Sequence, residues 1–171
     1  VGMGVDRDVR DWFDAMPSDL LAEHLIGGVA YREVPAERRT HVLGALIKAH
    51  DENQFLIPPL PNTQFTRDTT AWIFGGVTLN PMRWPARQHE TVLASAIYNH
   101  HPAFATRDFE FWYGCAEGNH GMSTLEGGDI MPIGNGAVLI GMGERSSWQA
   151  ITQVARSLFA HHAARKVVIA A

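Results

Sequence analysis

Two acidic residues, Asp68 and Glu126, each precede an arginine at the same spacing. Arg87 lies 19 residues after Asp68 (68 to 87), and Arg145 lies 19 residues after Glu126 (126 to 145). A carboxylate can pair with both arms of a guanidinium, and an arginine can pair with both oxygens of a carboxylate. Brought together, these side chains would form a pocket for a ligand that carries both groups. The alternative is a pair of structural salt bridges that the fold repeats.

Glu126 also stands at the start of a short turn that contains two glycines. Gly127 and Gly128 separate it from Asp129, just before an apolar segment. Paired glycines let the backbone turn sharply or come close to a ligand, because they carry no side chain. We therefore predict that the Glu126 carboxylate points at whatever fills that space, with solvated acids on a surface turn as the alternative.

Each acid–arginine pair encloses a predicted β-hairpin. Gly75-Gly76 marks the turn of the first hairpin, and Asn135-Gly136 marks the turn of the second. Both dipeptides favour tight turns, because their residues tolerate positive φ. The flanking apolar segments are 71–74 and 77–79 in the first hairpin, and 130–133 and 137–140 in the second.

A helix and a short strand are expected after each arginine. The order strand, strand, helix, strand (ββαβ) is therefore predicted twice, at about 63–114 and at about 124–171. The two acids lie 58 residues apart (68 to 126), which is near the length of a propeller blade. The fold class is accordingly α/β, with two repeats that place an acid and an arginine in equivalent positions.

The helices of the two repeats are predicted at about 86–100 and 146–160, each with one buried apolar face. Ser146 or Ser147 is placed to cap the second helix. The final strands are predicted at 109–113 and 166–171, and the latter is apolar on both faces, as a strand inside a sheet requires. The helix residues expected to be buried are Leu93, Ala96, Ile97, Trp148, Ile151, Ala155 and Leu158.

The first part of the chain has a different pattern. Residues 1–50 are predicted to form a small helical subdomain, and residues 51–171 to carry the two ββαβ modules. Pro17 interrupts the first helical pattern, Ser18 can cap a second helix, and Gly27-Gly28 is expected to end it. The apolar helical positions are Val5, Val9, Trp12, Phe13 and Met16, then Leu20, Leu21, His24 and Leu25, then Val42, Leu43, Leu46 and Ile47.

Composition excludes several classes of protein. The 171 residues are 46% apolar and 19% charged, as in an ordinary globular chain, and no apolar segment approaches the length of a membrane span. The net charge of −4 argues against nucleic acid or an anionic membrane as the main partner. A single cysteine fits a reducing compartment, so we expect a cytoplasmic protein.

Three further features suggest other chemistry. His100-His101 and His161-His162 are adjacent pairs, whose rings point to different helix faces, so no metal site is predicted from them. The segment 141–146 resembles a weak dinucleotide-binding turn, but a hairpin precedes it. Cys115 has no local base or basic neighbour that would make it a nucleophile, so we interpret it as incidental.

Arginine carries both a guanidinium and a carboxylate, and at this point the motifs match a known family. The chain resembles the bacterial arginine deiminases, members of the guanidine-modifying superfamily with the five-bladed α/β propeller (pentein) fold. The resemblance spans essentially all 171 residues but implies a family chain more than twice as long. The motifs that carry it are Pro61-Asn62-Thr63-Gln64-Phe65-Thr66-Arg67-Asp68, Gly76-Val77-Thr78-Leu79-Asn80-Pro81-Met82, Trp84-Pro85-Ala86-Arg87, Leu125-Glu126-Gly127-Gly128-Asp129 and Met142-Gly143-Glu144-Arg145-Ser146.

The resemblance implies a role for each site residue. Asp68 and Glu126 resemble the catalytic carboxylates that hold the substrate guanidinium. Arg87 and Arg145 resemble the pair that binds the α-carboxylate of the substrate. Two further substrate-binding residues are implied, Asn62 and Phe65. The nucleophilic cysteine of the family and its general acid/base histidine have no match among these residues, so we expect the chain alone to be inactive.

The implied reaction is the hydrolysis of L-arginine to L-citrulline and ammonia, through a covalent cysteine intermediate and without a metal or organic cofactor. The implied partner is the small-molecule substrate, with no nucleic acid and no membrane, and the complete protein is expected to be a homo-oligomer. The alternatives are another guanidine-modifying enzyme, such as a dimethylarginine hydrolase or an amidinotransferase, or a non-catalytic arginine-binding fragment.

Overall fold

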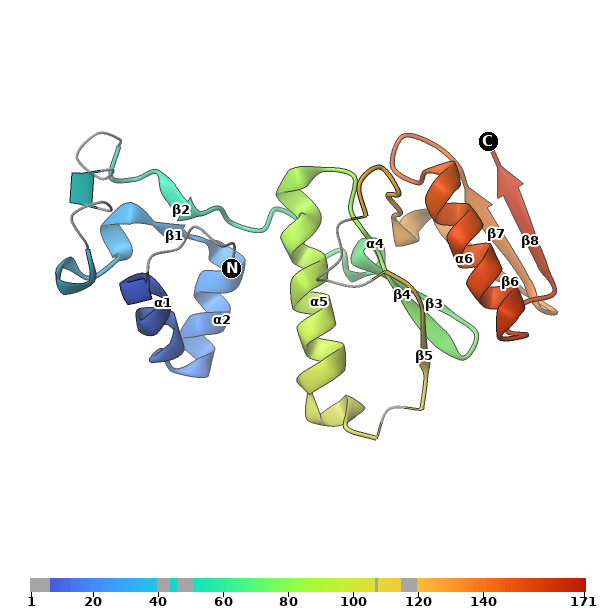
Figure 1. Cartoon of the computed structure of the whole chain (residues 1–171), viewed down its shortest axis with the longest axis horizontal. Coiled ribbons are helices and arrows are strands. Elements are labelled where there is room, and N and C mark those ends of the chain that lie inside the picture. The colour runs from blue at the N-terminus through green and yellow to red at the C-terminus, as the bar shows by residue number, and fades with distance from the viewer. Residues whose placement is uncertain (1–6, 40–43, 46–50, 107, 115–119) are drawn as a thin grey trace. The chain divides into compact units, whose positions relative to one another are not determined.

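The structure, a computed structural model, describes residues 7–39, 44–45, 51–106, 108–114 and 120–171 (Figure 1). The chain divides into two compact units, Val1–Pro61 and Asn62–Ala171. The boundary that the sequence suggested near residue 50 lies inside the first of these units. The second unit contains every charged residue of the predicted site.

In its described residues, the first unit combines helices α1 and α2 with a small sheet. Helix α1 spans Arg7–Asp14 and helix α2 spans Ser18–Gly27, while strand β1 (Val29–Ala30) pairs antiparallel with β2 (Phe55–Ile57). The prediction that residues 1–50 are wholly helical was therefore wrong at β1, and β2 lies between the expected helical subdomain and the first predicted module at about 63–114. The buried core of this unit is Val9, Phe13, Val29 and Val34.

The ends of helix α2 match the sequence signals only in part. Gly28 follows the helix with φ 82°, a left-handed conformation that glycine adopts without strain. Ser18 does not cap the helix but is its first residue, and Pro17 precedes it without a side-chain cap. Of the third predicted helix, Val42, Leu43, Leu46 and Ile47 lie outside the described residues.

The second unit consists of two ββαβ modules, as the sequence predicted. A short helix, α4 (Thr66–Thr69), leads into the first module. Its strands are β3 (Thr70–Ile73), β4 (Gly76–Leu79) and β5 (Glu110–Tyr113), with helix α5 (Gln88–His100) between the last two. The second module contains β6 (Ile130–Gly134), β7 (Ala137–Gly141), helix α6 (Trp148–Ala160) and β8 (Lys166–Ala170). In each sheet the first two strands are antiparallel and the last two are parallel.

The two hairpins use their glycines differently. In the second hairpin, Asn135 and Gly136 form the turn with φ 52° and 71°, as predicted. In the first, Ile73 pairs with Gly76, so Phe74 and Gly75 form the turn and the predicted position was wrong by one residue. Gly76 lies instead within β4, where an added Cβ would come 2.4 Å from the Trp112 ring. Its lack of a side chain makes room for that indole.

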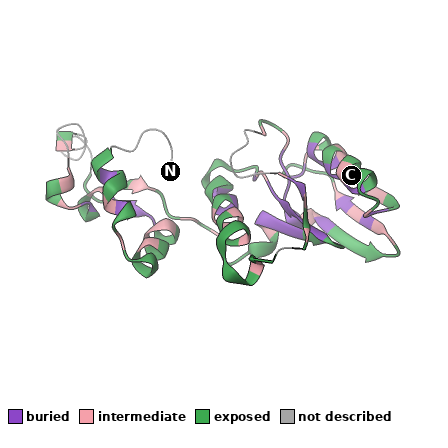
Figure 2. Cartoon of the chain, turned by 60° about the horizontal axis from the view of Figure 1, so that its bottom comes forward, coloured by how far each residue is buried: buried purple, intermediate pink, exposed green. Residues whose placement is uncertain are grey.

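One hydrophobic core serves both modules. It joins residues of β3 and β5 to residues of β6, β7 and α6, and Figure 2 shows buried strands inside the second unit. In β6 only Ile130 is buried, and the rest of that strand is exposed. Helix α6 turns a face of four residues into this core: Ala150, Ile151, Val154 and Leu158. The side chain of Ser147 accepts a hydrogen bond from the N–H of Ala150, so the predicted cap is present.

Several predictions of burial were wrong. Trp148 is 56% exposed, because the buried face of α6 is rotated away from it, and Ala155 is only half-buried. Helix α5 buries only Glu90 and Thr91, whereas Ile97 and Ala96 are exposed and Leu93 is half-buried. Strand β8 exists where predicted, but it lies at the edge of its sheet in the order β6-β7-β8.

Candidate functional site

Helix α4 and the segment 124–129 meet because of a glycine. A Cβ placed on Gly127 would lie 2.0 Å from the backbone oxygen of Arg67 and 2.8 Å from that of Thr70. No side chain fits there, so only glycine lets the backbone after Glu126 rest directly on α4. Arg67 reinforces the contact, since its Nη2 donates to the carbonyl oxygen of Ile130 at 2.7 Å.

This contact brings the two predicted acid–arginine pairs into one ionic cluster, which consists of Asp68, Arg87, Glu90, Glu126 and Arg145. Nη1 of Arg87 donates to Oδ2 of Asp68 at 2.9 Å, and Nη1 of Arg145 donates to Oε2 of Glu126 at 2.9 Å. Nη1 of Arg87 also lies 4.0 Å from Oε2 of Glu126. Both acids therefore approach the same Nη1 atom, at 2.9 Å and 4.0 Å, so their carboxylates lie in one site.

Glu126 is the most enclosed acid of the two predicted pairs. The residue is 3% exposed, and its Oε1 atom is buried without a hydrogen-bond partner among the described residues. An ionised oxygen buried in this way is costly unless a donor reaches it. This atom therefore marks a place for a hydrogen-bond donor that the described residues do not supply.

The hydroxyl of Ser146 fixes the backbone that presents Glu126. Ser146 is fully buried, and its Oγ donates to Oδ2 of Asp129 at 2.5 Å while it accepts the N–H of Glu126 at 3.1 Å. The sequence analysis considered Ser146 as a possible helix cap and placed Asp129 after the two glycines of the turn, without connecting the two residues. The position of Ser146 directly after Arg145 could have indicated this role, because neighbours of site residues commonly supply the hydrogen bonds that orient other site residues.

The two arginines differ in what remains free to bind. Arg87 is buried, with Nε and Nη2 donating to Glu90 and Nη1 to Asp68. Arg145 has a side chain that is 51% exposed, and only its Nη1 donates to a described residue. The remaining donors of the Arg145 guanidinium make no hydrogen bond to a described residue and can meet a carboxylate, whereas each nitrogen of Arg87 already donates to an acid.

Both arginines are held in the charged form. Burial would lower the pKa of Arg87, but the hydrogen bonds and charges of Glu90 and Asp68 outweigh it and raise that pKa above its usual value. The hydrogen bond and charge of Glu126 raise the pKa of Arg145. The site therefore keeps both positive charges at any working pH.

Glu90 is the member of the ionic cluster that sequence reasoning missed. Its carboxylate is buried, receives the Arg87 fork, and accepts the backbone N–H of Asn62 at 3.0 Å on Oε1. The three-residue spacing from Arg87 at a helix start could have indicated this pair. Among the predicted substrate-binding residues, Asn62 thus joins the cluster through its backbone, and Phe65 lies 51% exposed just before α4.

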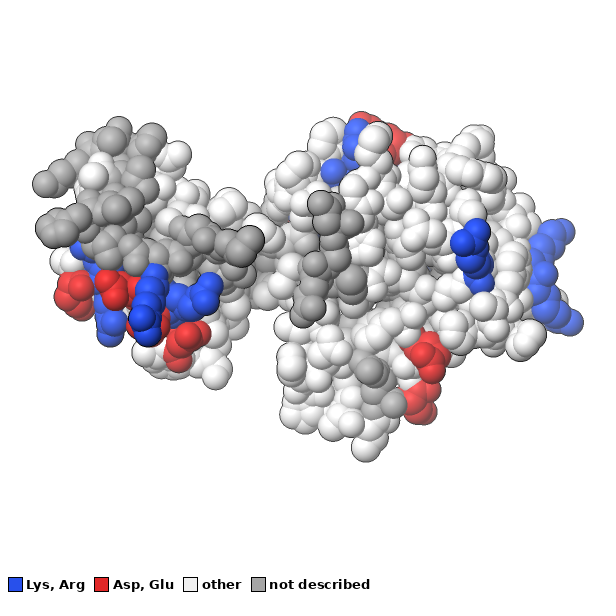
Figure 3. Space-filling model, viewed as in Figure 1, with Lys and Arg blue, Asp and Glu red and all other residues white. Residues whose placement is uncertain are grey.

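Other candidate sites gain little from the structure. No group of three or more potential metal ligands gathers in the described part of the chain. No described helix is long and apolar enough to cross a membrane. On the face in Figure 3, Lys and Arg are scattered and do not form a single patch. Cys115 lies outside the described residues.

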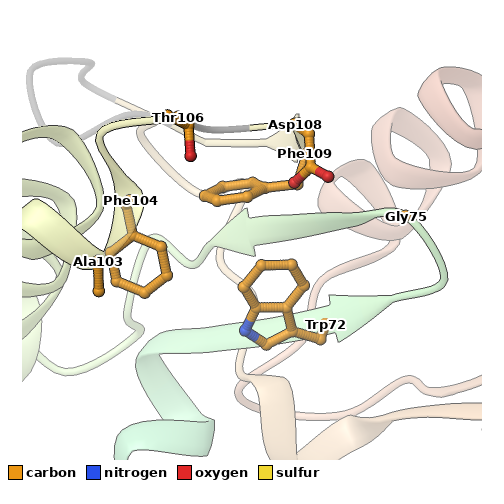
Figure 4. Close-up of a pocket in the computed structure, with 7 residues that line it drawn as sticks. All are labelled: Trp72, Gly75, Ala103, Phe104, Thr106, Asp108 and Phe109. Atoms are coloured by element: carbon orange, nitrogen blue, oxygen red, sulfur yellow. The ribbon is translucent and has the colours of Figure 1, made fainter.

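A surface pocket of about 470 Å³ lies elsewhere in the second unit. Figure 4 shows Trp72, Phe104 and Phe109 around it, with the Asp108 carboxylate beside Phe109. None of the ionic-cluster residues lines it. It is therefore separate from the site that the acids and arginines form.

Comparison with known proteins identifies one family. The family described as arginine deiminase matches residues 2–171. Among solved structures, similarity is found to dimethylarginine dimethylaminohydrolase in its adduct with 4-chloro-2-hydroxymethylpyridine, at 19% identity and a TM-score of 0.47. That match covers 67% of this chain and 43% of the other.

Two further structures of dimethylarginine dimethylaminohydrolase are similar over a longer stretch. A variant in its adduct with S-methyl-L-thiocitrulline has 19% identity and a TM-score of 0.47. A variant of the Pseudomonas aeruginosa enzyme in complex with citrulline has 18% identity and a TM-score of 0.47. Each match covers 86% of this chain and 57% of the other, so this chain spans about half the length of these proteins.

Proposed function

This chain belongs to the arginine deiminase family, and we propose that the complete protein hydrolyses L-arginine to L-citrulline and ammonia. Within it, the two ββαβ modules are two blades of a five-bladed α/β propeller. The modules supply the carboxylates and arginines that bind the substrate. The covalent chemistry uses a cysteine thiolate from elsewhere in the complete protein.

The observation that carries this proposal is the buried Oε1 atom of Glu126, which has no hydrogen-bond partner among the residues that the structure describes. A guanidinium is planar, cationic and rich in N–H donors, so it supplies the charge and the hydrogen bonds that this oxygen lacks. Asp68, which is less enclosed, lies across the Arg87 Nη1 atom from Glu126 and provides a second acceptor. The two acids thus fix the plane of the guanidinium.

The exposed fork of Arg145 suits the other end of the same ligand. Its free donors are able to bind a carboxylate bidentately while Nη1 stays on Glu126. The corresponding role of Arg87 at the α-carboxylate stays a prediction, because its three donor nitrogens are occupied by Glu90 and Asp68. Asn62 and Phe65 complete the proposed substrate-binding set.

The proposed chemistry requires no redox partner. The thiolate sulfur forms a bond to the guanidinium carbon, and one C–N bond of the tetrahedral adduct breaks as its nitrogen takes up a proton and leaves as ammonia. Water then adds to the same carbon and gives up its protons, and the C–S bond breaks to give citrulline and the free thiolate. Glu126 and Asp68 keep the carbon in line with the sulfur and offset the positive charge of the substrate until ammonia leaves.

Replacement of Arg145 by lysine tests the carboxylate assignment. In the complete protein, Arg145→Lys should lower kcat/KM for L-arginine at least about tenfold, or about 1.4 kcal/mol, because lysine keeps the charge but loses the fork. Agmatine, which has no α-carboxylate, should be a poor substrate of the parent and lose far less. Equal losses for both substrates would mean that Arg145 acts at the guanidinium end or on the fold.

The reaction itself is tested by product analysis on the complete protein. Incubation with L-arginine should release citrulline and ammonia in equal amounts. Release of methylated amines from N-methylated arginines in preference to ammonia from arginine would assign a dimethylarginine hydrolase instead. Transfer of the amidino group to an added amine would assign an amidinotransferase, and binding of arginine without any product would assign a non-catalytic module.

A further inference from the structure

We propose that Glu90 is a positioning residue that neutralises Arg87, so that Asp68 and Glu126 remain available to a cationic group. The inference rests on the proposed function, since it concerns the guanidinium end of that same site. Glu90 lies on helix α5, three residues after Arg87, and its side chain is 1% exposed.

The contacts of Arg87 are divided unequally. Glu90 takes two of its three donor nitrogens, with Oε2 at 3.1 Å from Nε and 2.8 Å from Nη2. Only Nη1 faces the other acids, at 2.9 Å from Asp68 and 4.0 Å from Glu126. The Glu90 carboxylate therefore sets the rotation of the guanidinium and leaves the Nη1 amino group to be shared between the two proposed substrate-binding acids.

The charges of these residues decide how strongly the two acids can attract a cationic ligand. Arg87 and Glu90 form a buried pair with no net charge, so the potential near Nη1 is dominated by Asp68 and Glu126. Without the Glu90 charge, a buried guanidinium would stand beside both acids and compete with a cationic ligand for them. The freed fork could also close on both oxygens of Asp68, because a bidentate pair is the preferred geometry.

The second module shows that this counter-charge is not a requirement of the repeat. Arg145 occupies the position equivalent to Arg87, with the same 19-residue spacing to its acid. Three residues later the second module carries Trp148, which is exposed, and no acid. An arginine can therefore pair with its acid in this fold without a carboxylate at that position. The Arg145 side chain is 51% exposed and the Arg87 side chain 7%, so the Glu90 charge goes with the burial of Arg87 beside the two acids.

Glu90 also connects Arg87 to the entry of the second unit. Its Oε1 atom accepts the backbone N–H of Asn62 at 3.0 Å and lies 3.3 Å from Nε of Arg87. One carboxylate thus holds two of the residues proposed to bind substrate. A substitution at Glu90 should therefore displace both Arg87 and Asn62, and should weaken binding of the guanidinium more than binding of the carboxylate.

The test is a double-mutant cycle in the complete protein, read by calorimetric binding of methylguanidine, a cation with no carboxylate. Glu90→Gln should weaken binding about tenfold, because a like charge beside the ligand is left uncompensated. Removing that charge as well, in Arg87→Gln/Glu90→Gln, should restore at least half of the loss on a logarithmic scale. A double variant that binds no better than Glu90→Gln would overturn the proposal.

Three further measurements separate this role from general damage. Glu90→Asp keeps the charge and should bind better than Glu90→Gln, and Glu110→Gln, on an exposed position of β5, should bind as the parent does. A crystal structure of Glu90→Gln should show the Arg87 fork turned onto Asp68; an unmoved guanidinium would count against the idea. A parent that binds methylguanidine but forms no citrulline would remove the proposed function and leave this inference standing.

Discussion

Replacement of Glu126 by glutamine in the complete protein should reduce kcat/KM for L-arginine by about a hundredfold or more, the scale expected when a preorganised charge is removed from the reacting group. Glutamine has nearly the same shape, but it removes the negative charge and presents an N–H₂ group to a cation. Within the described part of the chain, the buried Oε1 atom has no hydrogen-bond partner. Agmatine should suffer the same loss, because the change is at the guanidinium end.

The measurement is steady-state kinetics with both substrates, alongside thermal unfolding of each variant. Glu110→Gln is the matched control, since it makes the same chemical change at an exposed strand position. A loss below about tenfold, roughly 1.4 kcal/mol, would show that Glu126 does not face the transition state. A large loss for arginine with none for agmatine would move Glu126 to the carboxylate end of the substrate.

Gly127→Ala should be the most disruptive single methyl group that can be added to the site. The new Cβ would overlap the Arg67 carbonyl at 2.0 Å, and backbone cannot move aside as a flexible side chain would. We expect the free energy of unfolding to fall by about 3 kcal/mol, the upper range for overpacking in a well-packed region. The kcat/KM for L-arginine should fall as well, because α4 and the turn after Glu126 would be forced apart.

Gly75→Ala is the control for this variant. Gly75 lies in the first hairpin turn without positive φ, and an added Cβ meets nothing within 4 Å. Its free energy of unfolding, measured by urea denaturation, should stay within about 0.5 kcal/mol of the parent, as for most surface changes. If Gly127→Ala unfolds at the same urea concentration as Gly75→Ala, the contact between the two modules is not set by this glycine.

The sequence by itself determined the local elements and the pairing of acids with arginines. Asn135-Gly136 specified its turn, because a two-residue turn with positive φ at both positions selects those residues whatever surrounds it. The equal spacing from Asp68 to Arg87 and from Glu126 to Arg145 indicated a ligand pocket, with two structural salt bridges as the alternative, and the structure shows both ion pairs at 2.9 Å. A repeated fold places equivalent residues in equivalent contacts, so a repeat in the sequence is enough to predict them.

Tertiary structure alone decided which faces are buried and which donors remain free. Periodicity gives α6 an apolar side, but the neighbouring strands select Val154 for the core and leave Trp148 exposed. Gly76 was predicted to lie in a turn, but it lies in β4, where the Trp112 ring occupies the space that a side chain would fill. Arg87 and Arg145 are equivalent in sequence spacing, and only Glu90 makes one fork occupied while the other stays open. The burial of α6 residues and the space at Gly76 depend on contacts between elements far apart in the chain, which local patterns do not encode. The Arg87–Glu90 pair is local in sequence, but its place beside Asp68 and Glu126 is set by the same long-range contacts.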